Sequence, residues 1–167
     1  WEYLADKRFS RIALPSHGLS DDELEMMLNK ARETGLLNKA FFYVWDEPTK
    51  TNEYEQIKTL SDRIHRYAPE AKVLTTFYCG PTDGEHKDDL FAVFDILNGA
   101  TSIYCTGVWA LQDNENRSEQ CKAKLKSGQE WWSYVCMSNT PGLASNSTAI
   151  GNRATMSVSY THLTLPT

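Results

Sequence analysis

The sequence of 167 residues contains no run of apolar residues long enough to cross a membrane, so no membrane span is predicted. It also lacks clustered lysine and arginine. The formal net charge is −5, with 17 basic residues against 22 acidic ones. A surface that binds the phosphates of nucleic acid needs concentrated positive charge, so nucleic acid is not expected as a partner.

Cysteine is scarce, and its spacing does not indicate a metal site. The four cysteines, at positions 79, 105, 121 and 136, form no C-x-x-C pair, and no histidine lies at ligand spacing from them. We therefore expect neither a zinc site nor another metal or cofactor. Isolated cysteines usually pack as small hydrophobic residues.

Strand-like and helix-like segments alternate along the chain. Apolar runs predict strands at residues 11–14, 40–45, 72–78, 101–106 and 131–136. Between them, helical spacing of apolar residues and capping signals predict helices at 20–35, 52–67, 88–97 and 116–126. The repeat of about thirty residues is that of a βα unit, which requires a parallel sheet.

Two α/β folds satisfy this pattern: an open doubly wound sheet and a (β/α)8 barrel. No glycine-rich phosphate loop follows any predicted strand, and the strand ends carry aromatic and acidic residues instead. These features favour the barrel. A complete barrel takes about 250 residues, so we expect a partial (β/α)8 TIM-type barrel with about five strands present.

The candidate chemistry lies after the strand at 40–45, where Asp46 and Glu47 precede Pro48. Catalytic residues of βα barrels lie at the C-terminal ends of the strands, although the same three residues also suit a polar turn. The predicted sheet brings several rings towards this pair. The candidate substrate-binding residues are Trp45, Tyr78, Trp109, Trp132, Tyr134 and His17. The alternatives are core packing for the aromatic residues and an ordinary loop position for His17.

Two carboxylates among aromatic rings suggest a sugar site, because aromatic faces stack on pyranose rings and a carboxylic acid can protonate a glycosidic oxygen. Neighbours on one extended segment point to different sides and do not easily straddle a bond. We therefore expect separate roles. Glu47 would act as general acid and base, and Asp46 would orient the 2-acetamido group of the substrate, whose carbonyl oxygen attacks the anomeric carbon.

Three segments resemble the catalytic domain of glycoside hydrolase family 123, also described as the DUF4091 domain: residues 43–48 (Y-V-W-D-E-P), 5–8 (A-D-K-R) and 130–136 (E-W-W-S-Y-V-C). The resemblance spans most of residues 1–141. It implies a barrel enzyme that removes β-linked N-acetylgalactosamine by substrate-assisted retention, with Asp46 and Glu47 as its acidic pair. The family pattern continues into further strands, which this chain does not contain.

The resulting expectation is a glycosidase that removes a β-linked N-acetylhexosamine, with N-acetylgalactosamine favoured over N-acetylglucosamine. The partner would be a glycan that carries a 2-acetamido sugar. The alternative is a non-catalytic carbohydrate-binding barrel module. The compartment is left open, although a secreted or periplasmic location would suit an enzyme that degrades glycans.

The last ten residues resemble the translated read-through of a sequencing-library adapter. We therefore expect residues 1–157 to be a fragment of a glycoside hydrolase catalytic barrel and residues 158–167 to be a non-native tail. By itself, such a fragment is expected to be inactive.

Overall fold

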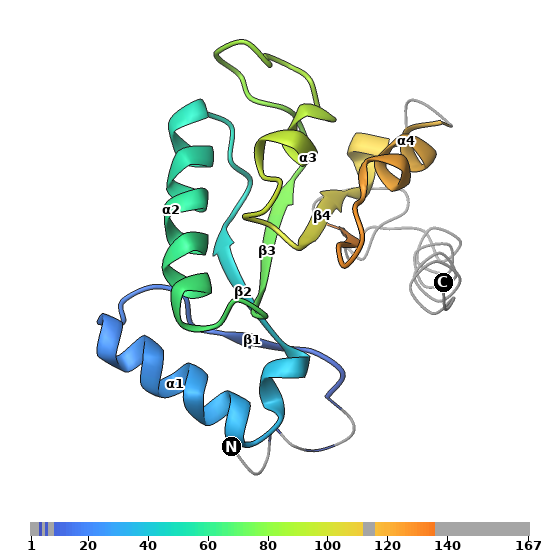
Figure 1. The fold of residues 1–167 in the computed structure, drawn as a ribbon. Coiled ribbons are helices and arrows are strands. Elements are labelled where there is room, and N and C mark those ends of the chain that lie inside the picture. The colour runs from blue at the N-terminus through green and yellow to red at the C-terminus, as the bar shows by residue number, and fades with distance from the viewer. Residues whose placement is uncertain (1–3, 5, 7–8, 112–115, 136–167) are drawn as a thin grey trace, which may run out of the picture.

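A computed structural model describes Leu4, Asp6 and residues 9–111 and 116–135. Its centre is a five-stranded, entirely parallel sheet in the order β1-β2-β3-β4-β5 (Figure 1). The strands are β1 (Ile12–Leu14), β2 (Ala40–Trp45), β3 (Lys72–Phe77), β4 (Ile103–Gly107) and β5 (Glu130–Tyr134). The predicted α/β fold with five parallel strands is confirmed. The order contains no reversal of the kind that defines a doubly wound sheet.

Helices connect the strands, as the alternating pattern predicts. They are α1 (Asp21–Glu33), α2 (Thr51–Tyr67), α3 (Ala92–Ile96) and α4 (Arg117–Lys124), with short 3-10 turns η2 (Leu36–Lys39) and η3 (Val108–Leu111). Helix α1 begins with the predicted capping box. The Glu23 backbone N–H donates to Ser20 Oγ at 3.2 Å, and the Ser20 backbone N–H donates to the Glu23 carboxylate at 2.8 Å.

Two predicted helix starts are wrong, for local reasons. Helix α2 begins at Thr51 rather than after a cap at Asn52, because the Glu53 carboxylate accepts the backbone N–H groups of Thr49 and Lys50 at 2.6 and 2.8 Å. Helix α3 begins at residue 92 rather than 88, because Asp88 has a φ of 61°, which is incompatible with a right-handed helix. The predicted tail at 158–167 lies outside the described residues.

The two faces of the sheet differ in what covers them. One face packs against α1, α2 and α3 and holds the main core; its fully buried members include Leu24, Leu28, Phe42, Val44, Tyr54, Ile57, Val73, Phe77 and Tyr104. The other face carries a smaller cluster of Leu74, Ile103 and Cys105, against which Phe41, Trp132 and Tyr134 pack. We call this second surface the open face.

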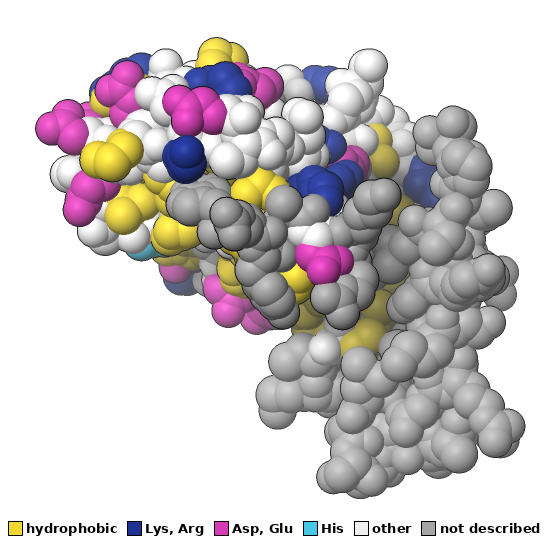
Figure 2. All heavy atoms as spheres, turned by 90° about the horizontal axis from the view of Figure 1, so that it is seen from below, with side chains coloured by type: hydrophobic (Ala, Val, Ile, Leu, Met, Phe, Trp, Pro, Cys, Tyr) yellow, Lys and Arg dark blue, Asp and Glu magenta, His cyan; other side chains and the backbone are white. Residues whose placement is uncertain are grey.

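The described surface carries both signs of charge. Seen from below in Figure 2, acidic and basic side chains are interspersed, with hydrophobic side chains among them. Along α1, acidic residues occupy the first turn and basic residues the last turn, which suits the helix dipole. No helix in the described part of the chain has both the length and the hydropathy of a membrane span.

Candidate active site

The acidic pair lies at the edge of the sheet that is formed by the C-terminal ends of the strands. Asp46 and Glu47 directly follow β2, and because all five strands are parallel, the C-terminal ends of β3, β4 and β5 lie along the same edge. Tyr78 follows β3, Trp109 follows β4, and Tyr134 ends β5. The structure thus brings the predicted acids and three of the predicted aromatic residues to one rim of the sheet.

A bulge in β2 decides which side chains reach the open face. Tyr43 pairs with Leu74 and Trp45 pairs with Thr75, so Val44 is an extra residue in the ladder. Regular alternation would place Tyr43 and Trp45 on the same face. Instead, Trp45 packs against the main core on the helix side, and the carboxylate of Asp46 meets the side chains of Tyr43 and Thr76.

Two hydroxyl groups fix the carboxylate of Asp46. The Tyr43 hydroxyl donates to Asp46 Oδ1 at 2.6 Å, and the Thr76 hydroxyl donates to the same oxygen at 3.0 Å. Thr76 is buried, with 8% of its surface exposed, whereas Asp46 is exposed. The side chain of Asp46 is therefore oriented by its neighbours while its surface remains open to solvent.

Glu47 has different surroundings. Its backbone φ is 50°, in the left-handed region that non-glycine residues seldom adopt, and its N–H donates to Thr76 Oγ1 at 3.1 Å. Its Oε1 accepts a hydrogen bond from the hydroxyl of Tyr134 on β5. Uncommon backbone conformations of this kind cluster at functional sites, where surrounding contacts hold them in place.

Aromatic rings border the acids. Trp109 lies edge-to-face with Tyr134 at a centroid distance of 5.2 Å and tilted against Tyr78 at 6.1 Å. Gly107 makes room for this arrangement, because a Cβ atom there would lie 2.8 Å from the Trp109 ring. Tyr78 remains 38% exposed, so part of its ring is free to contact a ligand.

The environment keeps the phenols of the site protonated. Burial and the hydrogen bond to Asp46 raise the pKa of Tyr43 to about 12. Burial, followed by the hydrogen bond to Glu47, raises the pKa of Tyr134 well above its usual range. The neighbouring thiol of Cys79 and burial raise the pKa of Tyr78. Both Tyr43 and Tyr134 are therefore hydrogen-bond donors at neutral pH.

The remaining predicted site residues have other contacts. His17 follows β1 and is exposed; its Nδ1 lies 2.9 Å from Ser16 Oγ, which donates to the Tyr43 carbonyl at 2.8 Å. Trp132 is on the open face but one step below Tyr134, where its Nε1 donates to Glu130 Oε2 at 3.0 Å. Trp45 packs on the helix side, as described above.

Two residues that the sequence did not single out for this site are central to it. Tyr43 and Thr76 connect Asp46 and the Glu47 backbone, and they join β2 to β3. Regular alternation along residues 72–78 does place Thr76 on the same face as Leu74 and Tyr78. A lone threonine in a strand, however, carries no functional signal unless the acid opposite is known.

The arrangement of the two carboxylates is suited to acid–base chemistry. One carboxylate is fixed by two hydroxyl donors, and the next is bound by a phenol from another strand. Within residues 9–111 and 116–135, together with Leu4 and Asp6, no group of three or more His, Cys, Asp or Glu side chains is arranged to hold a metal ion. The chain matches no protein-family model and no curated protein sequence.

Proposed function

We propose that this chain carries the acidic pair of a retaining glycosidase that removes a β-linked N-acetylhexosamine, with N-acetylgalactosamine favoured. The observation that carries the proposal is the placement of Asp46 and Glu47 in distinct environments at the C-terminal end of β2. Adjacent acids with different partners suit two separate roles.

We also propose that the sheet is part of a (β/α)8 barrel. Strands that follow one another in the chain are neighbours in the sheet, which is the order found around such a barrel. Contacts between the first and last strands, described below, support a curved sheet. The acids would then lie at the end of the barrel where catalytic residues occur.

In the proposed reaction, Glu47 donates a proton to the glycosidic oxygen while the C–O bond to the anomeric carbon breaks. The carbonyl oxygen of the substrate's own acetamido group forms the new bond to that carbon. Water then opens the cyclic intermediate, and Glu47 takes up the proton that water releases. The hydrogen bond from Tyr134 holds Glu47 on the side facing the leaving group.

Asp46 would orient the acetamido group. Tyr43 and Thr76 both bind Oδ1, so Oδ2 is the oxygen that we propose accepts the acetamido N–H. A negative carboxylate at this position increases the electron density on the acetamido carbonyl oxygen and so strengthens it as a nucleophile. The two hydroxyl donors keep Asp46 in one rotamer, which lowers the entropy lost on reaching the reactive geometry.

The rings of Tyr78 and Trp109 would bind the sugar. Pyranose rings present C–H groups that pack on aromatic faces, and the exposed part of Tyr78 lies beside Trp109 at the same rim. This surface supports binding even without catalysis. It therefore favours the second candidate function, a carbohydrate-binding barrel module without hydrolytic activity.

The test uses the longer protein from which the sequence predicts this segment to come. We expect hydrolysis of a chromogenic β-N-acetylgalactosaminide, slower hydrolysis of the N-acetylglucosaminide, and none of the β-galactoside that lacks the acetamido group. Glu47→Gln and Asp46→Asn should each lower kcat by about a hundredfold or more. Hydrolysis that survives Glu47→Gln would refute the proposal, and sugar binding without turnover by the wild type would favour the binding module.

A further inference from the structure

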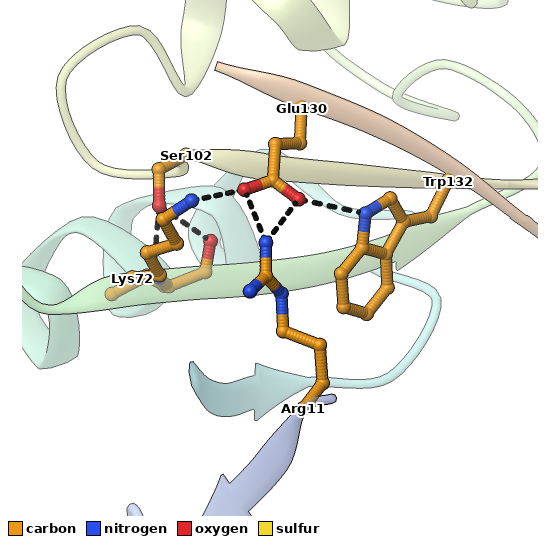
Figure 3. A network of polar contacts seen from close by, with 6 residues as sticks. Arg11, Lys72, Ser102, Glu130 and Trp132 are labelled. Atoms are coloured by element: carbon orange, nitrogen blue, oxygen red, sulfur yellow. Dashed lines mark hydrogen bonds and ion pairs between the residues drawn. The ribbon is translucent and has the colours of Figure 1, made fainter. Parts of the chain in front are cut away.

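A second polar cluster lies on the open face at the N-terminal ends of the strands, whereas the acids follow the C-terminal end of β2. Figure 3 shows the members of this cluster. Glu130, the first residue of β5, binds Arg11 immediately before β1 and Lys72, the first residue of β3. Arg11 Nη2 lies 3.0 Å from Oε1 and 3.2 Å from Oε2. Trp132 adds a fourth contact, with its Nε1 3.0 Å from Oε2. Both carboxylate oxygens therefore accept two hydrogen bonds each.

The cluster connects the two edges of the sheet. In a flat five-stranded sheet, four spacings of about 4.8 Å would separate the edge strands by about 19 Å. An extended arginine and an extended glutamate joined by a hydrogen bond reach only about 15 Å between their Cα atoms. Because Arg11 and Glu130 are in contact, the sheet must curve, with the open face on its concave side.

The same strand carries the partner of the proposed acid. Glu130, Trp132 and Tyr134 alternate along β5 and pair with Ile103, Cys105 and Gly107 of β4. Glu130 binds β1 and β3, Trp132 packs edge-to-face on Phe41 of β2 at 5.5 Å, and Tyr134 binds Glu47. Within the described residues, the backbone of β5 pairs with β4 alone in the sheet, so these side-chain contacts across the concave face fix the distance of β5 from β2.

We propose that Glu130 is a positioning residue that holds β5 at the distance from β2 at which Tyr134 binds Glu47. The effect of this positioning on catalysis rests on the proposed function, whereas the positioning itself does not depend on that function. The two cationic partners of Glu130 lie at the starts of different strands, Arg11 immediately before β1 and Lys72 on β3, so the loss of its charge weakens both connections together.

The local electrostatics fit this role. Burial by itself would raise the pKa of Glu130, but hydrogen bonds from Lys72 and Arg11 outweigh it, and the net pKa lies below the usual value. The carboxylate is thus charged at neutral pH. The side chains of Arg11, Lys72 and Glu130 are 36%, 30% and 25% exposed, so water only partly screens the cluster.

The test measures the position of Tyr134 without relying on activity. The complete 167-residue chain is labelled with 13Cζ-tyrosine, and Tyr134→Phe identifies the Tyr134 resonance. In Glu130→Gln, one acceptor oxygen becomes an NH2 donor that faces other donors. We expect the Tyr134 resonance to move towards that of free tyrosine and its pKa to fall towards 10. A Tyr134 signal and titration identical to the wild type would overturn the proposal.

Two further variants sharpen the result. Glu119→Gln removes an exposed ion pair with Lys122 on α4, and it should leave the Tyr134 resonance unchanged. Arg11→Met leaves the Lys72 contact in place, so it should move the resonance in the same direction but less than Glu130→Gln does. If Glu130→Gln does not fold, Arg11→Met carries the test by itself, and an unchanged Tyr134 signal in that variant also overturns the proposal.

An activity measurement in the longer protein separates positioning from general destabilisation. Glu130→Gln should lower kcat by about tenfold or more, as small misplacements of catalytic groups do. Added to Tyr134→Phe, the same change should cost little more, because its effect acts through Tyr134. If Glu130→Gln lowers kcat equally in the wild type and in Tyr134→Phe, its effect does not act through Tyr134. If the wild type shows no hydrolysis, the proposed function fails while the resonance measurement still decides the positioning.

Discussion

The hydroxyl of Tyr134 donates a hydrogen bond to Glu47, although the two residues lie 87 positions apart and β3 and β4 separate their strands. This contact runs across the concave face rather than along the sheet. It makes the proposed acid dependent on the last described strand, so the site is complete only when β2 and β5 are both in place.

Replacement of Tyr134 by phenylalanine removes this hydrogen bond and keeps the ring that packs on Trp109. Hydrogen bonds to charged groups contribute about 1.5–3 kcal/mol, so we expect kcat of the longer protein to fall by about tenfold to a hundredfold. The pH–rate profile also shows whether the pH above which activity falls differs between the variant and the wild type. Tyr67→Phe, on α2 at the helix side of the sheet, is a control for the loss of one phenol; an equal fall in both variants would contradict a specific role.

Replacement of Thr76 by valine keeps the shape of the side chain but removes the hydroxyl that accepts from the Glu47 N–H and donates to Asp46. Because Thr76 is buried, we expect the free energy of unfolding to fall by about 1–3 kcal/mol. Urea denaturation measures this change. Thr59→Val removes an exposed helix hydroxyl and should have a much smaller effect, and equal losses would argue against the network around Thr76.

The left-handed backbone conformation at Glu47 predicts that glycine is more favourable than alanine at this position. Glu47→Ala and Glu47→Gly both remove the carboxylate, but only glycine adopts a φ of 50° without steric cost. We therefore expect the glycine variant to be more stable than the alanine variant by about 1 kcal/mol. Thermal unfolding of the two proteins gives the comparison. A more stable alanine variant would show that this backbone conformation is not kept in solution.

We expect Tyr43 to make the free energy of unfolding decrease at high pH. Its pKa is raised to about 12 from the ordinary value of 10.0 for tyrosine, so the folded state keeps a proton that the unfolded state releases. This contribution is fully present below pH 10 and is lost as the pH rises towards 12. Unfolding free energies measured from pH 9 to 12 should fall less steeply for Tyr43→Phe than for the wild type. Parallel curves would mean that Tyr43 does not contribute.

Local patterns predicted most of the elements correctly. The bounds of β2 at Ala40 and Trp45 and the capping box at Ser20 follow from hydrophobic runs and turn chemistry, which depend on neighbouring residues only. The bulge at Val44 depends on the register with β3 and could not be predicted in this way. For the same reason, regular alternation along β2 would have placed Trp45 and Asp46 on the wrong faces.

The placement of the candidate residues at one rim was predicted, but the contacts between them were not. Strand ends located Asp46, Glu47, Tyr78, Trp109 and Tyr134 at one rim, because parallel strands share a direction. The contacts of Tyr134 with Glu47 and of Arg11 with Glu130 join residues 87 and 119 positions apart. These contacts follow from the curvature of the sheet. The spacing of residues along the sequence does not predict that curvature.

The extra residue in β2 also makes the site sensitive to the pairing register between β2 and β3. If Val44 paired with Thr75 in a regular ladder, the Trp45 indole would turn over the open face and the Asp46 carboxylate would enter the helix-side core, where burial of an unpaired charge is very costly. Exchange of Val44 for isoleucine keeps the register and so keeps both orientations. At this point of the chain, a shift of one residue is more damaging than a change of side chain.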